Sequence, residues 1–521
     1  MHKYHCFNRR KQHGVVRAVR QAEHNSCWQS LHRASHFLRM TVQNSSHDDN
    51  PKKLVVIYAP PGMAGHLVPT AELGNLLVAQ GLQVTVVTAG EADQGAAGGS
   101  FLAGIAATNP SLSFHRLPAA TLPSDAPAGI TFEVKVFELA RASNPDLRAF
   151  LRSASPAALV VDFFCSSALR VGAELRVPTY FFLTTCVASV ALLLYQPVIH
   201  ERTALSFRDL GGGLVRVPGL PPIPADHLAA AVLDRDSLSN RLFLDLSEQL
   251  CGSQGVIVNS CRSLEPRAAD AIVSGLCTFP GRRTPPLYCV GPLVKPEEDA
   301  GAKQRHACLA WLDGQPEASV AFLCFGSLGR FGAKQTKQIA AGLEASGQRF
   351  LWAVRRPQGD EDQLDEDDDL DALFPEGFLQ RTRDRGLVVM SWAPQREVLA
   401  HGAVGGFVTH CGWNSVLEAV MAGVPMLAWP LYAEQRMNKV FLVEEMRLTV
   451  AMAGYDKEMV EAGEVAAKLT WLIDSDGGRE LRQRTQAAMQ RAKEALSDDG
   501  ESKAALMNLA RQWKRTNDCT E

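Results

Sequence analysis

The sequence has no excess of basic side chains: 53 Lys and Arg stand against 56 Asp and Glu, for a net charge of −3. This balance argues against a nucleic-acid partner. Long hydrophobic runs are also missing. The most apolar stretch, Phe181–Tyr195, has 15 residues and includes Thr184, Thr185 and Ser189, whereas a membrane-spanning helix needs about 20 apolar residues. We therefore expect no membrane span.

Paired cysteines and the common nucleotide-binding motifs are absent as well. None of the 12 cysteines belongs to a Cys-x-x-Cys pair, which indicates scattered thiols in a reducing compartment and predicts a cytoplasmic protein. No Gly-x-Gly-x-x-Gly follows a strand pattern and no Gly-Lys dipeptide occurs, so neither the dinucleotide fingerprint nor the P-loop is present. A nucleotide would have to be bound by a different motif.

The first fifty residues differ in composition from the rest. Residues 1–40 hold eight Lys or Arg and one acid, Glu23. A basic, acid-poor leader is typical of an organelle transit peptide, which would direct the protein to a plastid. The alternative, which we favour, is that translation begins at Met40 and that residues 1–39 are not native. We predict a disordered leader over 1–50.

From residue 53 onward, apolar strand patterns alternate with helical patterns. The predicted strands lie at 53–59, 84–88, 158–161, 179–183, 255–258 and 287–290, and then at 319–325, 349–354, 387–390, 403–409 and 425–429. Such alternation is typical of α/β folds built on parallel sheets covered on both faces. We predict an N-terminal domain over 51–292, a linker over 293–304, a C-terminal domain over 305–490, and a final helix over 491–521 that packs back on the first domain. An acidic run at 360–371 lacks the residues of a calcium loop, and we interpret it as a solvated loop.

One block of 44 residues, 392–435, carries most of the functional signal. It contains Trp392-Ala-Pro-Gln395, His410-Cys-Gly-Trp-Asn-Ser415, Gly423-Val-Pro425 and Leu431-Tyr-Ala-Glu-Gln435. In length and at nearly every diagnostic position, this block resembles the plant secondary-product signature of family-1 UDP-glycosyltransferases. The resemblance covers most of residues 53–510. It implies a GT-B fold, in which two Rossmann-like doubly wound domains face each other across a cleft, with the donor in the C-terminal domain and the acceptor in the N-terminal one.

A diphosphate needs hydrogen-bond donors and positive potential, and the turn Gly412–Ser415 before a predicted helix offers both. The resemblance implies that His410, Asn414, Ser415 and Ser327 contact the phosphates, that Trp392, Ala393 and Gln395 bind uracil, that Glu418 binds the ribose, and that Trp413, Glu434 and Gln435 hold the sugar. Each residue alone has a simpler explanation, since Ser415 and Glu418 also fit a capping box and either tryptophan could belong to the core. The complete spaced set favours UDP-sugar binding.

On the acceptor side, His66 follows the first predicted strand at a helix start, and Asp162 ends the strand at 158–161. Both positions lie at the carboxyl edge of the sheet, where doubly wound folds bind ligands. A helix start opposes protonation, so we expect a neutral His66 imidazole. Alone, either residue could be a helix cap. The resemblance makes them the catalytic pair: His66 deprotonates the acceptor hydroxyl, Asp162 orients it, and no metal or cofactor is required.

The resemblance thus implies an inverting, UDP-glucose-dependent O-glucosyltransferase, a hexosyltransferase that adds β-glucose to a small phenolic acceptor such as a flavonoid, chalcone or anthocyanidin. Gln435, the last residue of the block, is associated with glucose in this family. By position, Phe164, Thr184 and Tyr432 are candidates for the acceptor pocket, and the family prior favours a monomer. The alternatives are a terpenoid or hormone acceptor, transfer to carbon, and a non-catalytic UDP-sugar-binding protein.

Overall fold

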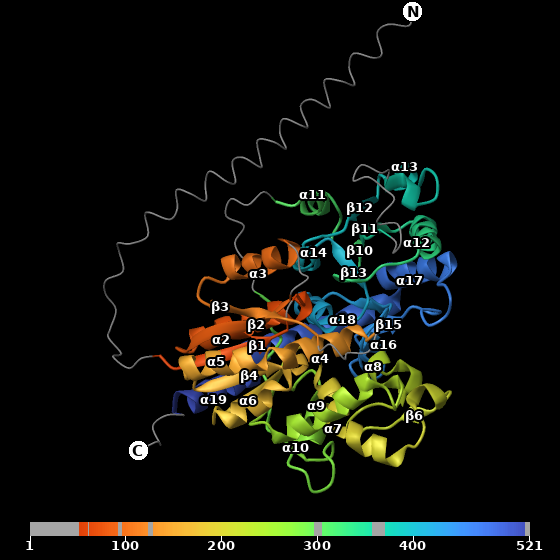
Figure 1. Cartoon of the computed structure of the whole chain (residues 1–521). Coiled ribbons are helices and arrows are strands. Elements are labelled where there is room, and N and C mark those ends of the chain that lie inside the picture. Colours follow the sequence, from red (N-terminus) through yellow and green to blue (C-terminus); the bar gives the residue numbers. More distant parts are fainter. Residues whose placement is uncertain are drawn as a thin grey trace, which may run out of the picture. The chain divides into compact units, whose positions relative to one another are not determined.

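A computed structural model of the chain describes residues 52–60, 62–91, 96–122, 129–295, 305–356 and 370–515 (Figure 1). The chain from Lys52 onward forms one compact unit. The predicted leader over 1–50, most of the predicted linker and most of the acidic run lie outside the described residues. The domain boundaries drawn from the sequence stay a prediction.

The first half of this unit contains a seven-stranded parallel sheet with the order β3-β2-β1-β4-β5-β8-β9. Its strands are β1 (Leu54–Ala59), β2 (Gln83–Glu91), β3 (Ser113–Ala120), β4 (Ala158–Asp162), β5 (Thr179–Leu183), β8 (Val256–Val258) and β9 (Leu287–Cys289). The strand order reverses between β1 and β4. In doubly wound sheets such a reversal opens a crevice at the carboxyl ends of the strands.

Helices follow these strands and cover the sheet. They are α2 (Ala64–Ala79), α3 (Ala96–Thr108), α4 (Phe132–Ala142), α5 (Asn144–Ala154), α6 (Ala168–Glu174), α7 (Val187–Arg202), α8 (Ala230–Leu233), α9 (Leu238–Gly252) and α10 (Pro266–Val273), with short 3-10 turns η2 (Phe163–Cys165), η3 (Phe207–Asp209) and η4 (Ala225–His227). A two-stranded ribbon, β6 (Leu214–Val215) with β7 (Ile223–Pro224), lies within the long connection after α7.

The second half contains a six-stranded parallel sheet with the order β12-β11-β10-β13-β14-β15. Its strands are β10 (Val320–Cys324), β11 (Arg349–Val354), β12 (Gly386–Met390), β13 (Val404–Thr409), β14 (Met426–Ala428) and β15 (Thr449–Ala451). The accompanying helices are α11 (Ala307–Asp313), α12 (Ala333–Ser346), η5 (Leu370–Leu373), α13 (Phe378–Thr382), α14 (Gln395–Ala400), α15 (Trp413–Ala422), α16 (Gln435–Val440), the π-helical η6 (Phe441–Glu445), α17 (Ala462–Asp474) and α18 (Asp476–Leu496). The predicted α/β class with two parallel sheets, as in the GT-B fold, is confirmed.

The last helix, α19 (Glu501–Arg515), belongs structurally to the first sheet. Leu506, Leu509 and the fully buried Trp513 join the apolar cluster formed by β1, β2 and β5. The Trp513 ring lies 5.3 Å from that of Tyr180 on β5. Figure 1 shows the blue α19 beside the red and orange elements of the first half.

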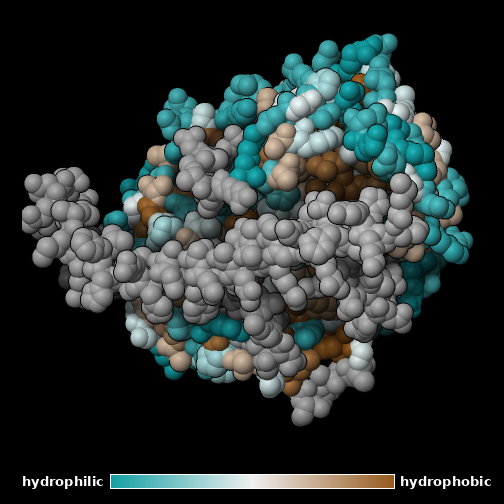
Figure 2. All heavy atoms as spheres, turned by 90° about the horizontal axis from the view of Figure 1, so that it is seen from above, coloured by the Kyte–Doolittle hydropathy of each residue, from teal (hydrophilic) through white to brown (hydrophobic). Residues whose placement is uncertain are grey.

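Polar residues surround these cores. On the face seen in Figure 2, hydrophilic side chains dominate outside the grey atoms, and apolar ones show mainly in recesses. Among the described residues, no helix is both long and apolar enough to cross a membrane. The apolar stretch Phe181–Tyr195 instead divides between the end of β5 and the start of α7.

Candidate active site

His66 and Asp162 meet at the crevice between β1 and β4. The turn after β1 leads into α2, which carries His66 in its first turn, and Asp162 is the last residue of β4. His66 Nδ1 lies 2.7 Å from Asp162 Oδ2. The other carboxylate oxygen, Oδ1, accepts a hydrogen bond from Phe164 N at 2.9 Å. Since β1 and β4 are parallel neighbours, their carboxyl ends bring the two side chains together.

The electrostatics of this pair differ from the expectation. Burial lowers the pKa of His66, but the negative charge of Asp162 and its hydrogen bond raise that pKa by more, so the net pKa lies above 6.5. The prediction that the helix start would oppose protonation was therefore wrong in direction, because a nearly fully buried carboxylate acts at closer range than the helix dipole. A carboxylate only accepts, so Nδ1 carries the proton and Nε2 keeps the lone pair when the ring is neutral.

His410 lies at the end of β13, on the other side of the site. Its ring is enclosed by two glycines: a Cβ on Gly326 would lie 2.5 Å from His410 Nε2, and one on Gly412 would lie 2.4 Å from it. Burial lowers the pKa of His410 to about 4, so the ring is neutral. Within the described part of the chain, its buried Nδ1 has no hydrogen-bond partner, which leaves a polar atom that a ligand could satisfy.

The N-terminus of α15 follows directly. Gly412 is the N-cap residue and no side chain caps the helix, so first-turn N–H groups lack intrahelical acceptors. Gln395 Nε2 donates to Ser415 Oγ at 2.9 Å and to Glu418 Oε2 at 2.8 Å. Ser415 and Glu418 both lie inside the helix, so the alternative interpretation of this pair as a capping box was wrong.

The predicted base-binding residues lie after β12. Trp392 is 62% exposed and faces the His306 ring edge-on, with the ring centroids 5.7 Å apart. The neighbouring Ala393 is buried. Ser327, in the turn after β10, is exposed. These positions leave an indole surface accessible to a planar ligand.

Two of the predicted sugar-binding side chains are already engaged. The indole of Trp413 is buried and donates from Nε1 to the Asn259 carbonyl at 2.7 Å, so it is not available to a sugar hydroxyl. This corrects the prediction for that side chain. Gln435 Oε1 accepts hydrogen bonds from Leu431 N and Tyr432 N at 2.9 and 3.0 Å, so the amide oxygen is occupied and the NH2 group is left as its donor. Glu434 lines the cavity described below.

Asn414 connects the two halves at the catalytic turn. Its Nδ2 donates to the Gly65 carbonyl at 2.7 Å, and its Oδ1 lies 3.4 Å from Asn259 Nδ2. Gly65 directly precedes His66. The Asn259 and Gly65 contacts could not be predicted from the sequence, because each joins residues more than 150 positions apart in the chain.

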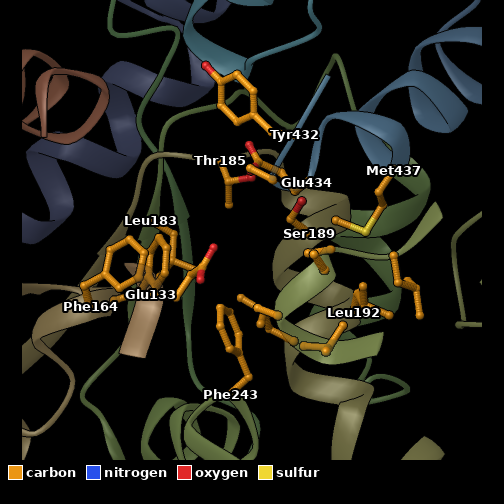
Figure 3. A pocket seen from close by; sticks show the side chains of 18 of the residues that line it. Glu133, Phe164, Leu183, Thr185, Ser189, Leu192, Phe243, Tyr432, Glu434 and Met437 are labelled. Carbon is orange, nitrogen blue, oxygen red and sulfur yellow. The ribbon is translucent and has the colours of Figure 1, made fainter. Parts of the chain in front are cut away.

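A cavity of about 310 Å³ opens beside His66 (Figure 3). The three predicted pocket residues, Phe164, Thr184 and Tyr432, all line it. Most of its wall is apolar, and Phe163 and Phe164 each lie with ring centroids 5.4 Å from the His66 ring. The cavity also involves residues that the sequence did not single out, namely Met63, Glu133, Phe163, Thr185, Phe243 and Met437. The apolar ones among them have the pattern of core residues, so no sequence signal separated them from the core.

Comparisons with known proteins agree with this geometry. Residues 285–476 match the family described as UDP-glucoronosyl and UDP-glucosyl transferase. UDP-glycosyltransferase 88F3 of Pyrus communis is 44% identical over 477 residues, which cover 88% of this chain and 98% of that protein. The chain belongs to the plant UDP-glycosyltransferase family.

Other UDP-glycosyltransferases resemble the chain to a similar degree. Phloretin 2′-O-glucosyltransferase of Malus domestica is 43% identical over 479 residues, covering 88% of this chain and 98% of that protein. Phytolacca americana UGT2 was solved with UDP-2-fluoro-glucose and pterostilbene. Its structure matches this chain with a TM-score of 0.79 and 33% sequence identity, and the match covers 89% of this chain and 100% of the UGT2 chain. As a UDP-glycosyltransferase, this protein is an enzyme that transfers a sugar from a nucleotide donor. The roles of its individual residues stay predictions.

No group of three or more His, Cys, Asp or Glu side chains within the described ranges is arranged to hold a metal ion. That this glycosyltransferase needs no metal stays a prediction.

Proposed function

We propose that this glycosyltransferase transfers glucose from UDP-glucose to a hydroxyl of a small phenolic acceptor, with inversion at the anomeric carbon. The observation that carries the proposal is the pair of His66 and Asp162, 2.7 Å apart at the edge of an apolar cavity of about 310 Å³. The cavity has the size and polarity of a site for a small aromatic molecule. The names of the relatives, which include phloretin, anthocyanidin and isoflavone glucosyltransferases, support a phenolic acceptor.

In the proposed reaction, His66 Nε2 takes the proton of the acceptor hydroxyl, and the oxygen of that hydroxyl forms a bond to the anomeric carbon of the donor glucose. The bond from that carbon to the UDP oxygen breaks, and its electron pair leaves with UDP. Asp162 stabilises the imidazolium that forms, because its carboxylate stays at hydrogen-bond distance from Nδ1. The uncapped N-terminus of α15 offers N–H donors and a positive dipole end to the departing diphosphate.

The sugar is assigned from Gln435, whose carboxamide oxygen is held by two backbone N–H groups. This leaves its NH2 group as a donor of fixed position. Glu434 supplies a carboxylate beside it. The proposal requires no metal or other cofactor, so EDTA should leave the rate unchanged.

The test is UDP release from purified protein with UDP-glucose and a panel of flavonoids, simple phenols and terpenoid alcohols, with product mass read in parallel. We expect UDP release with a gain of one hexose on a phenol. His66→Ala should reduce the rate on the order of a hundredfold or more, since general bases contribute about 10²–10⁴-fold. Preference for a terpenoid alcohol or for another UDP-sugar would replace the acceptor or the donor assignment, respectively.

Two further expectations belong to the proposal. We expect a monomer, which light scattering after size-exclusion chromatography would check, and a cytoplasmic location, which imaging of the full chain with a C-terminal fluorescent tag would check.

A further inference from the structure

Glu133 contributes a carboxylate to a cavity whose wall is otherwise largely apolar. It lies in the first turn of α4 and lines the cavity together with Phe132, Phe164 and Phe243. Figure 3 shows its carboxylate directed into the cavity. Among the described residues, none donates a hydrogen bond to this carboxylate or forms an ion pair with it. A carboxylate in such surroundings gains from a ligand that brings its own donor.

Contacts between aromatic rings connect α4, the helix that carries Glu133, to the base. Glu133 and Phe137 are four residues apart on α4, so they lie on the same face of the helix. The Phe137 ring lies 5.1 Å from the Phe164 ring, which in turn lies 5.4 Å from the His66 ring. A planar acceptor lying along these rings with one hydroxyl at His66 would present its far end to Glu133.

The polar groups of the cavity wall near His66 are different residues from Glu133, namely Thr184 and Glu434. Thr184 Oγ1 lies 3.5 Å from His66 Nδ1, and the charge of Glu434 contributes to raising the pKa of His66. These groups lie near the His66 ring and line the same cavity. Glu133 is therefore the acidic group available to a second, remote hydroxyl in the described wall of the cavity.

A simpler role for Glu133 also exists, because an acid in the first turn of a helix stabilises the helix dipole. That role explains neither the direction of the side chain into the cavity nor its place among phenylalanines. It does predict an effect on stability without an effect on ligand choice, which separates the two roles experimentally.

We propose that Glu133 forms a specificity subsite that accepts a hydrogen bond from a second hydroxyl of the acceptor and repels acceptors with a carboxylate at that end. This inference rests on the proposed function and deepens it: the preferred acceptors carry two phenolic hydroxyls at opposite ends of a planar skeleton. An ionised carboxylate accepts hydrogen bonds from phenols strongly and cannot donate to a second carboxylate.

The test uses three biphenyls that share one para hydroxyl and carry hydrogen, hydroxyl or carboxylate at the far para position. Calorimetry measures their binding to the protein saturated with UDP, where no transfer can occur. We expect the dihydroxy compound to bind about tenfold more tightly than the monohydroxy one, beyond the factor of two from its symmetry, as a hydrogen bond to a charged group gives. The carboxylate compound should bind most weakly.

Glu133→Met should abolish this order, with the dihydroxy compound keeping only the twofold advantage of its symmetry over the monohydroxy one and the carboxylate compound gaining affinity. Glu133→Gln should keep part of the hydroxyl preference and lose the discrimination against carboxylate. Glu138→Gln is the matched control, since Glu138 lies on the same helix but pairs with Arg141. It should leave all three affinities unchanged.

An unchanged order of affinities in Glu133→Met, or no binding of any biphenyl to the unaltered protein, would overturn the inference. Turnover with UDP-glucose, measured separately, distinguishes the two proposals. If the proposed function fails, no product forms from any biphenyl while the affinities still report on Glu133. If only the subsite is wrong, product forms and the preferences do not respond to Glu133.

Discussion

Asp162 uses both of its oxygens, one toward the base and one toward the chain that follows it. Oδ2 lies 2.7 Å from His66 Nδ1, and Oδ1 accepts from Phe164 N at 2.9 Å. The second contact fixes the carboxylate to its own strand end. The imidazole is thereby oriented by a side chain that cannot easily rotate away.

Asp162→Asn should alter the pH profile as well as the rate. His66 must be unprotonated to act as a base, so kcat/KM rises with pH through a His66 pKa that lies above 6.5. Removing the charge of Asp162 lowers that pKa, and the acid limb of the profile should move to lower pH. The maximum rate should fall on the order of a hundredfold. Profiles measured with a weakly acidic phenol check this, and an acid limb that does not move would contradict the assignment of His66 as the base.

His410 should make the folded protein sensitive to acid. Its pKa is about 4 in the folded chain, while an exposed histidine titrates near 6.5. The unfolded chain binds the proton first, so the stability from this group is present above about pH 6.5 and is lost as the pH falls toward 4. Between about pH 7 and pH 5 the loss should be about 2 kcal/mol.

Urea unfolding of the unaltered protein and of His410→Gln checks this value. Glutamine does not titrate, so the free energy of unfolding of the variant should fall by about 2 kcal/mol less over the same range. If the free energy of unfolding changed equally with pH in the two proteins, His410 would not be held neutral in the folded chain.

Among single residues, those that belong to a motif could be predicted and those on helix faces outside the motifs could not. His66 and Asp162 were identifiable because the family resemblance marks both positions, and because each lies near the carboxyl end of an apolar strand, where parallel strands bring such residues together. Glu133 and Phe243 lie on helices, where the sequence does not reveal whether a face meets the core or a cavity. The Trp413 indole was assigned to the sugar for a similar reason, since its partner Asn259 is distant in the chain.

At the scale of elements, the turns that follow β10 and β13 enclose the His410 ring between Gly326 and Gly412. Gly412→Ala should displace the imidazole, because its Cβ would lie 2.4 Å from Nε2. We expect the Kd for UDP to rise on the order of tenfold, the effect of about one lost hydrogen bond. Calorimetric titration with UDP measures it.

Gly332→Ala provides the matched control. Gly332 and Gly412 are both N-cap residues with extended backbones, at φ −66°, ψ 157° and φ −62°, ψ 133°. A Cβ at Gly332 would have no atom within 4 Å. UDP affinity should therefore stay the same in Gly332→Ala. Equal effects of both substitutions would trace the loss to helix capping rather than to His410.

The predicted strands were confirmed, because continuous apolar runs such as β1 and β13 are easily distinguished. Four strands were missed. β3 is an edge strand with mostly exposed or half-buried side chains, β15 has three residues, and the β6–β7 ribbon pairs two residues per strand. A strand with few buried residues leaves no hydrophobic pattern, and its pairing depends on a neighbour rather than on its own sequence.

At the scale of the whole molecule, α19 packs against the first sheet and helps to cover its apolar face. Trp513→Ala should lower the free energy of unfolding by about 3–5 kcal/mol, the usual cost of removing a large buried aromatic side chain. Trp392→Ala is the contrasting variant, since Trp392 is 62% exposed while Trp513 is fully buried. It should leave stability within about 0.5 kcal/mol and weaken UDP binding. Urea unfolding and UDP titration of both variants measure this, and a stable Trp513→Ala protein would contradict the role assigned to α19.

The position of α19 also sets an order for synthesis. The strands of the first sheet leave the ribosome before those of the second, but Leu506, Leu509 and Trp513, which complete the apolar cluster beside β1 and β5, are translated only after the second sheet. During most of translation this surface is exposed, and exposed apolar surface of this kind attracts chaperones and promotes aggregation. A premature stop just before Glu501 would leave the second sheet intact and yet release a chain whose first sheet lacks the cover that α19 provides. Nonsense changes at or shortly before codon 501, which remove α19, should therefore be as damaging to yield as changes in the centre of the gene.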